Sequence, residues 1–392
     1  MGDEEDGEVE DEVDILENPV IIIDNGSGIC KAGLSSDQNP SNVFLEAIGR
    51  PRQTWKNSAS KPAKEYFCGD EILPHMDKLS ITHPIENGII EDFELMELVW
   101  EHTFVNELQV DPSQHALLLT EPPFNPKPNR EKMVEIMFET FGVPSMNISI
   151  QGVLALQGQG RTTGLVLDSG EGVTYTLPIF DGFALPHCIN RLDLAGRELN
   201  TLLAKLLAQE QRLCLTTTAQ QHQTRLMKES LCYCALDPSS EFAEAASYKL
   251  PDGSQIELRD EQWKCPEALF NPSMVGLESA GVAGLIWDSI QRCEIDLRKT
   301  LLSNVVLSGG STMFPKFTER ITKELRAYAP SAAHQNVRVV HSKHMPQKYV
   351  VWSGAQVFAN LRSLQEDQWM NFEDYDEYGP SFIHDKISVR YS

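Results

Sequence analysis

One short pattern occurs twice in this chain and constrains the fold more than any other feature of the sequence. Residues 20–34 contain Asp24-Asn25-Gly26-Ser27-Gly28 between two apolar, strand-like runs. Residues 165–180 contain Asp168-Ser169-Gly170-Glu171-Gly172 in the same setting. Because the strand, the Asp-x-Gly-x-Gly turn and the second strand are repeated in order, the sequence predicts two related halves built around similar hairpins.

The rest of the chain alternates between strand-like and helical segments. This alternation predicts an α/β fold, and 392 residues are enough for two domains with separate cores. We expect strands over residues 116–120 and 305–307, and helices over residues 192–207 and 224–236, from an N-cap at Asn129 and from near Pro315.

The two glycine turns suit a phosphate ligand. A glycine turn exposes successive backbone N–H groups, and without Cβ atoms an anion can approach them closely. Asp24 and Asp168 then suit a hydrated Mg²⁺, because magnesium keeps most of its waters and takes few carboxylates. Lys31 would add positive charge beside the phosphate oxygens. The residues predict a magnesium nucleotide in a cleft between the halves; ordinary tight turns with two surface aspartates are the alternative interpretation.

The absence of several motifs, together with the composition, argues against other classes of protein. The chain lacks GxxxxGK[ST], HExxH and GxSxG, and no GxGxxG follows its first strand, which argues against P-loop, zinc protease, serine hydrolase and Rossmann sites. A net charge of -24 disfavours direct nucleic-acid binding, and no apolar run approaches the ~18–20 residues of a membrane span. Residues 1–17 are predicted to be a disordered acidic tail. Eight cysteines without a CxxC pair indicate a reducing, intracellular compartment.

Longer motifs surround these turns and occur in a fixed order. They include Asn129-Arg130-Glu131-Lys132-Met133, Gly160-Arg161-Thr162-Thr163-Gly164, Pro266-Glu267-Ala268-Leu269-Phe270 and Gly379-Pro380-Ser381. Together with the first turn they resemble the actin family over about residues 20–385. The resemblance implies the actin-like ATPase fold, shared with Hsp70 and sugar kinases, with two duplicated lobes around a nucleotide cleft. The first lobe would comprise residues 18–157 and 351–392, with a mobile subunit-contact loop at 53–68, and the second lobe residues 158–350.

The resemblance also implies roles for individual residues. Asp24 and Asp168 would hold Mg²⁺ or Ca²⁺, while Gln151, Asp168 and Tyr175 would form the catalytic set, with Gln151 positioning the attacking water. Glu171 stands where the family usually has an aspartate near the ribose. The residues expected to bind ATP or ADP are Gly26, Ser27, Gly28, Ile29, Lys31, Ser169, Gly170, Glu171, Gly172, Val173, Arg225, Lys228, Glu229, Gly309, Gly310, Met313, Phe314 and Lys348.

Several positions depart from the actin pattern. Tyr175 stands where actin has a histidine that assists the hydrolytic water, and a phenol with a pKa near ~10 is a poor base at neutral pH. We therefore expect a weak ATPase, slower than actin; alternatively, Tyr175 only fills space and water is activated otherwise. Asn87 replaces the histidine that actin methylates.

Other departures lie on surfaces that actin uses for contacts. The loop at 53–68 carries three lysines and Pro62 instead of an apolar centre, which would weaken a buried subunit contact; free variation of an exposed loop is the alternative. In the groove where many actin partners insert a helix, Gln157 replaces a tyrosine and Phe358 an aliphatic residue. The acidic head is longer than that of actin, and residues 387–392 end the chain differently.

The leading interpretation is a cytoskeletal, nucleotide-dependent structural subunit that is able to form filaments. Its expected partners are itself, other actin-family subunits, and actin-binding proteins with altered groove specificity, in the cytoplasm. The alternative is a non-polymerising subunit of a larger complex, such as axonemal dynein, dynactin or a chromatin remodeller, with a ciliary or nuclear location. A sugar kinase or chaperone is disfavoured because no further motif supplies an acceptor site or a peptide-binding domain. Neither nucleic acid nor a membrane is an expected direct partner.

Overall fold

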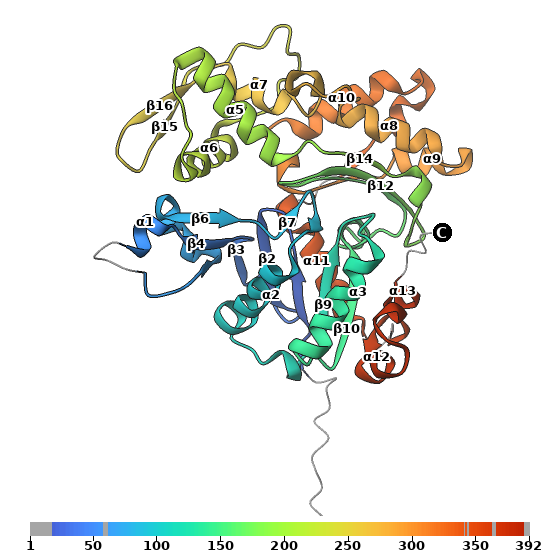
Figure 1. Cartoon of the computed structure of the whole chain (residues 1–392). Helices are drawn as coiled ribbons and strands as arrows, with labels where there is room; N and C mark the ends of the chain where they lie inside the picture. Colours follow the sequence, from blue (N-terminus) through green and yellow to red (C-terminus); the bar gives the residue numbers. More distant parts are fainter. Residues whose placement is uncertain (1–17, 58–61, 341, 343–344, 363–365, 388–392) are drawn as a thin grey trace, which may run out of the picture.

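The computed structural model describes residues 18–57, 62–340, 342, 345–362 and 366–387. Within these ranges, two six-stranded sheets lie in separate halves of the molecule (Figure 1). The predicted acidic tail and the last five residues lie outside the described part. No helix in the described ranges combines the length and the apolar character that crossing a bilayer requires.

The first sheet is built around the first predicted hairpin. β1 (Ile21–Asp24) pairs antiparallel with β2 (Ile29–Leu34) and parallel with β9 (Leu117–Glu121). β10 (Ser145–Ile150), β19 (Met370–Asn371) and β3 (Asn42–Leu45) complete the order β19-β10-β9-β1-β2-β3. The three isoleucines of β1 are 0% exposed, as expected of a central strand covered on both faces.

The second sheet repeats this arrangement. β11 (Gly164–Ser169) pairs antiparallel with β12 (Thr174–Phe180) and parallel with β17 (Val305–Ser308), which pairs parallel with β18 (Val339–Val340). β13 (Phe183–Ala184) and β14 (Asn190–Leu192) both pair with β12. Each sheet therefore contains a glycine-turn hairpin whose first strand is followed by parallel strands, which confirms the predicted mixed α/β fold with two related sheets.

Helices cover the sheets, and the end of the chain returns to the first sheet. α11 packs against α4 and β1, β19 extends β10, and α13 lies beside α3 (Figure 1). The lobe boundaries themselves stay a prediction. The helices are α1 (Gln53–Lys56), α2 (Phe93–His102), α3 (Lys127–Glu135), α4 (Gln151–Gln157), α5 (Gly196–Gln211), α6 (Thr218–Leu231), α7 (Glu261–Glu267), α8 (Val282–Arg292), α9 (Ile295–Leu302), α10 (Phe317–Tyr328), α11 (Val350–Asn360), α12 (Phe372–Tyr378) and α13 (Ile383–Lys386).

Some predicted helix ends were wrong. Asn129 is not an N-cap, because α3 already begins at Lys127 after Pro126, and a proline is tolerated in its first turn. The start of α10 at Phe317 agrees with the prediction near Pro315, and Lys316 before it takes a left-handed conformation with φ of 66°. α6 begins earlier than expected, because the Thr217 side chain accepts a hydrogen bond from the Gln220 amide in a capping box.

The segment predicted as a mobile contact loop contains a short helix. Trp55 of α1 stacks on Phe67, with ring centroids 5.7 Å apart, and also contacts His75. Lys64 pairs with Glu71 at 2.6 Å. Residues 58–61 lie outside the described part of the chain, and the function of this segment stays a prediction.

Candidate functional site

A cavity of about 340 Å³ opens where the two hairpin turns face each other, and it collects nearly all the predicted site residues. They come from both sheets, from α6 and from the segment that precedes α11. Ser169 does not line the cavity, because it is 0% exposed and its hydroxyl shares a hydrogen bond with that of Thr174. The predicted residues in the lining are Asp24, Gly26, Ser27, Gly28, Ile29, Lys31, Gln151, Asp168, Gly170, Glu171, Gly172, Val173, Tyr175, Arg225, Lys228, Glu229, Gly309, Gly310, Met313, Phe314 and Lys348.

The two turns meet so closely that glycine is required in both. A Cβ on Gly172 would lie 2.5 Å from the Ser27 hydroxyl oxygen, and one on Gly28 would lie 2.7 Å from the Glu171 Cγ. The Ser27 hydroxyl also accepts a hydrogen bond from the Gly88 amide at 2.9 Å. The absent side chains therefore bring the backbones of the turns together around one space.

Asp24 ends β1 and is almost completely buried. Its carboxylate accepts hydrogen bonds from the Lys31 ammonium at 2.8 Å and from the Thr120 hydroxyl at 2.7 Å. Burial alone would lower the pKa of Lys31, but the Asp24 carboxylate outweighs it and the pKa is raised. The cavity therefore contains a charged lysine paired with a carboxylate at the end of the first hairpin.

Asp168 lies next to the last residue of β11 and is the counterpart of Asp24 in the repeat. Burial raises the pKa of its carboxyl to about 6; Asp24 acts in the same direction, while the Ser308 hydroxyl opposes it. A bound cation would relieve this buried charge. In the described ranges no three His, Cys, Asp or Glu side chains converge on one point. Two carboxyl groups suit a cation that keeps most of its waters, such as Mg²⁺.

Gln151 and Tyr175 lie beside these carboxyl groups. The Gln151 amide nitrogen donates to the Asn25 carbonyl at 2.9 Å and to Asp24 at 3.2 Å, so the first residue of α4 is fixed against the first turn. Tyr175 is opposite Asp168 in the β11–β12 register and is only 2% exposed. Gln151 and Tyr175, which are predicted to act on the attacking water, therefore line the cavity beside the two carboxyl groups.

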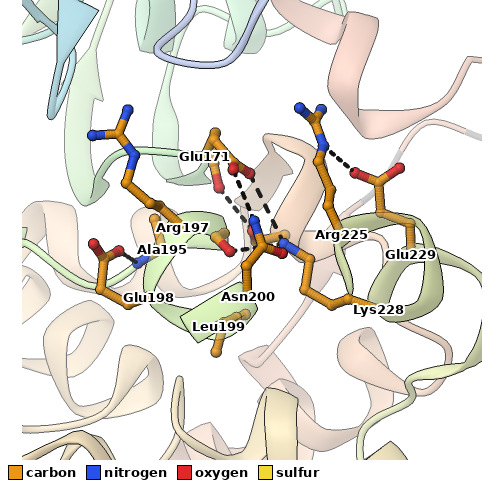
Figure 2. Close-up of polar contacts among 12 residues, drawn as sticks. Glu171, Ala195, Arg197, Glu198, Leu199, Asn200, Arg225, Lys228 and Glu229 are labelled. Carbon is orange, nitrogen blue, oxygen red and sulfur yellow. Dashed lines mark hydrogen bonds and ion pairs between the residues drawn. The ribbon is translucent and has the colours of Figure 1, made fainter. Parts of the chain in front are cut away.

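The cavity lining includes charged side chains from α6, which lie close to Glu171 of the second turn (Figure 2). Arg225 donates to Glu229 at 2.9 Å. Lys228 donates to the Gly196 carbonyl at 2.8 Å and lies 3.9 Å from the Glu171 carboxylate. Together with Lys31, which also lines the cavity, these cations favour a ligand that carries several negative charges.

A third glycine turn follows β17 and packs against the second glycine turn. Gly309 has a φ of 86°, and a Cβ on it would lie 2.2 Å from the Ser169 carbonyl oxygen. The Ser311 hydroxyl donates to the Gly170 carbonyl at 2.7 Å. Next to this turn, Met313 and Phe314 provide apolar surface suited to a base.

Glu46 lies behind the first turn and was not singled out from the sequence. It is 0% exposed, and its backbone amide donates to the Gly28 carbonyl at 3.3 Å. The Cys30 thiol and the Gly26 amide face its carboxyl group, although none of the described residues reaches it with full hydrogen-bond geometry. Burial raises the pKa of Glu46 to about 8, so the side chain is mainly protonated at neutral pH.

Sequence reasoning also missed part of the lining. Asn25 belongs to the first glycine turn, and Ser308 and Ser311 flank Gly309 and Gly310, which the resemblance had named, so these neighbours were the available signal. The others are brought in by the fold, and no local pattern identifies them. The missed residues are Asn25, Val43, Gly88, Ser308, Ser311, Tyr349 and Val351.

The lining fits a magnesium nucleotide in its chemistry. Glycine turns leave backbone N–H groups open to phosphate, the two aspartates suit a hydrated cation, and apolar side chains suit a base. A family model described as Actin matches residues 15–388, which include both sheets and every residue of the cavity. Members of this family generally bind and hydrolyse ATP. The chain has the actin fold and belongs to the actin family.

Proposed function

We propose that the protein is a nucleotide-dependent structural subunit that binds Mg-ATP between its two halves. One observation carries this proposal: both glycine turns, Asp24, Asp168 and Lys31 line a single cavity of about 340 Å³. The turns would bind the phosphates through backbone N–H groups, and the two aspartates would hold the hydrated cation. When bound, the cation neutralises phosphate charge and orients the ligand.

Hydrolysis is expected to be slow. Gln151 is anchored by its amide nitrogen to the Asn25 carbonyl and to Asp24, which fixes where its amide oxygen can orient a water. Tyr175 is buried at the position where a base would act, and a phenol is a poor general base for water. The chain's own residues therefore position the water without removing its proton efficiently.

Filament formation is the first form of this function, with the chain itself or other actin-family subunits as partners. In this form the protein acts in the cytoplasmic cytoskeleton, together with actin-binding proteins. The match over residues 15–388 supports it, because self-association is characteristic of the family.

A second form, a non-polymerising subunit of a larger assembly, is favoured by a filled groove. The groove that contains Gln157 and Phe358, lined mainly by β10 and α4, retains a cavity of only about 20 Å³. Phe358 lines it, is 4% exposed and stacks on Trp369 at 6.2 Å, and Ile387 lines it as well. A partner helix would have to displace these side chains. An axonemal dynein, dynactin or chromatin-remodelling complex is the corresponding kind of assembly.

Sedimentation of the full chain with Mg-ATP, over a concentration series, separates the two forms. Phosphate release is followed in the same tubes, with actin as the reference and EDTA-treated protein as the cation-free sample. A pellet above a critical concentration supports the filament; protein that stays in the supernatant with bound nucleotide supports the dedicated subunit.

The nucleotide site is tested separately by equilibrium binding. Asp24→Ala and Asp168→Ala should each lose most Mg-dependent ATP binding, whereas Asp376→Ala on exposed α12 serves as the matched control. Failure of the wild-type chain to bind ATP would overturn the proposed function.

A further inference from the structure

α12 presents aromatic side chains at the outer edge of the first half (Figure 1). Phe372 is 50% exposed and Tyr378 is 54% exposed. Tyr375 lies midway between them in the helix, and positions three residues apart are neighbours on a helix surface. Exposed aromatic rings that gather on one element are typical of protein–protein contact surfaces.

Neighbouring rings hold these side chains in place. Tyr375 stacks on Phe138 with ring centroids 4.9 Å apart, and Phe372 packs edge-on against the same ring at 6.1 Å. Tyr378 stacks on Phe382 at 4.7 Å. Because the rings are fixed before a partner arrives, less side-chain entropy is lost on binding.

The carboxylates of α12 are unfavourably arranged in the free chain. Glu373 and Glu377 are four residues apart, where like charges on a helix repel each other. Asp376 and Glu377 lie near the C-terminal end of the helix, where its dipole disfavours negative charge, and its last turn contains no basic residue. In the described part of the chain, Lys386 pairs with Asp374 at 3.2 Å, whereas no cation pairs with the other three. A basic partner would relieve this repulsion.

The aromatic rings and the carboxylates select the same kind of ligand. A guanidinium group stacks on an aromatic ring and also pairs with carboxylates, whereas an apolar helix would leave the carboxylates without partners. A second copy of this chain is disfavoured because each copy carries a net charge of -24. Nucleic acid is disfavoured because its phosphates would be repelled as well. The surface chemistry therefore fits a basic segment of another protein.

We propose that the exposed side of α12 binds an arginine-rich segment of a partner protein, whose guanidinium groups stack on Phe372 and Tyr378 and pair with the neighbouring carboxylates. This inference goes beyond the proposed function and does not depend on the nucleotide site, because no residue of α12 lines that cavity. Lysine would also pair with the carboxylates, but its ammonium group lacks the planar surface that stacks on a ring. Arginine should therefore be preferred over lysine.

The test measures binding of a short fluorescein-labelled peptide of alternating arginine and serine to the full chain by fluorescence anisotropy. The wild type should bind it about two- to fivefold more tightly than the matched lysine peptide. The double variant Phe372→Ser, Tyr378→Ser should lose this preference, although its charge is unchanged. Phe180→Ser combined with Phe183→Ser removes two similarly exposed rings from β12 and β13 and should keep the preference.

A second pair of variants tests the carboxylates. Glu373→Gln combined with Glu377→Gln should weaken binding of both peptides about three- to tenfold at low salt, and by less at high salt. Glu94→Gln combined with Glu101→Gln removes two exposed charges from α2 and should bind like the wild type. The acidic residues 1–17 are present in every variant, so their own attraction for the peptides is constant across the series.

Several outcomes would overturn the inference. Equal weakening by the α2 and α12 charge variants would show that binding follows overall charge alone. An unchanged arginine preference in the α12 aromatic variant, or no binding by the wild type, would equally contradict it. Sedimentation of the aromatic variant adds a further check, because an altered oligomeric state would assign this surface to a second copy of the chain. Circular dichroism melts and ATP binding equal to the wild type confirm that each α12 variant is folded.

Discussion

At the residue scale, the site depends on a few buried side chains that neighbouring groups hold in one orientation. Tyr175 is opposite Asp168 on adjacent strands, and a Cβ on Gly152 would lie 3.5 Å from its ring. Gln151 is fixed by its hydrogen bonds to the first turn. Since the surroundings define these positions, we expect the chemical group at position 175 to control how readily a positioned water loses its proton.

Replacing the phenol by an imidazole should accelerate hydrolysis. Tyr175→His introduces a group that titrates near neutral pH, and general-base assistance is worth about 10²–10⁴-fold, so we expect phosphate release to rise at least tenfold. Single-turnover phosphate release from pre-bound ATP measures the effect. Tyr175→Phe should match the wild type if the phenol contributes no base, and a Tyr175→His rate equal to wild type would contradict this role.

Glu46 should make folding stability depend on pH. An unfolded glutamate titrates near ~4.3, whereas the folded side chain has a pKa of about 8, so the native state binds more protons between these values. Stability contributed by this group is therefore lost as pH rises through that window. The Glu46→Gln variant should not lose this stability as the pH rises. Its free energy of unfolding should exceed that of the wild type by ~1–4 kcal/mol at pH 8 and should converge with it near pH 4.5, since each pKa unit is worth ~1.36 kcal/mol.

Urea unfolding at several pH values measures this difference. Exposed Glu101→Gln on α2 is the matched control and should follow the wild-type pH profile. A Glu46→Gln variant that is equally destabilised at every pH would show that burial of the neutral acid is not the cause.

At the element scale, strands were easier to predict than helix ends. β1 and β11 contain apolar runs directly before glycine turns, and β2 and β12 follow those turns, so the hairpins and the repeat could be inferred from local sequence. The start of α6 depends on a capping box at Thr217, whose side-chain hydrogen bond was not recognised. The same holds for the candidate site. Its turn residues were predicted from the local sequence, whereas Val43 and Glu46 come close to the site only because β3 pairs with β2.

The contact between the two turns should fail when one glycine gains a methyl group. Gly172→Ala would place a Cβ 2.5 Å from the Ser27 hydroxyl oxygen, so we expect a loss of about 1–3 kcal/mol in stability from overpacking. Nucleotide affinity should fall as well, because the turns must separate. Thermal unfolding without nucleotide reports the first effect.

Gly310→Ala is the matched substitution for stability, since a Cβ there meets no atom within 4 Å. It should melt close to the wild type. Equal melting temperatures for the two variants would mean that the turns adjust without cost.

At the scale of the whole molecule, arginines of the second half reach backbone carbonyls of the first. Arg191 donates to the Asn87 carbonyl at 3.1 Å, and Arg197 donates to that of Ser27 at 3.4 Å. Both bonds join the two halves. We expect them to resist separation of the halves, and release of a bound nucleotide would depend on that separation.

Removing one of these bonds should speed nucleotide release. We expect Arg191→Ala to raise the dissociation rate of a fluorescent ATP analogue about three- to tenfold, because a partly exposed charged hydrogen bond is lost. Stopped-flow displacement by excess ATP provides the rate. Arg292→Ala, which breaks a surface pair with Asp288 on α8, should leave it unchanged; a similar acceleration in that variant would rule out a specific link between the halves.

The return of the chain to the first sheet has a consequence for synthesis. β10 receives its neighbour β19, and β1 its cover α11, only after the whole second half has left the ribosome. At about 5–20 residues per second, the nascent protein spends tens of seconds with an unpaired strand edge and an uncovered apolar face. Such surfaces invite pairing with other chains. The connectivity that joins both termini of the described chain to one half therefore creates a need for protection of the unfinished polypeptide by a chaperone.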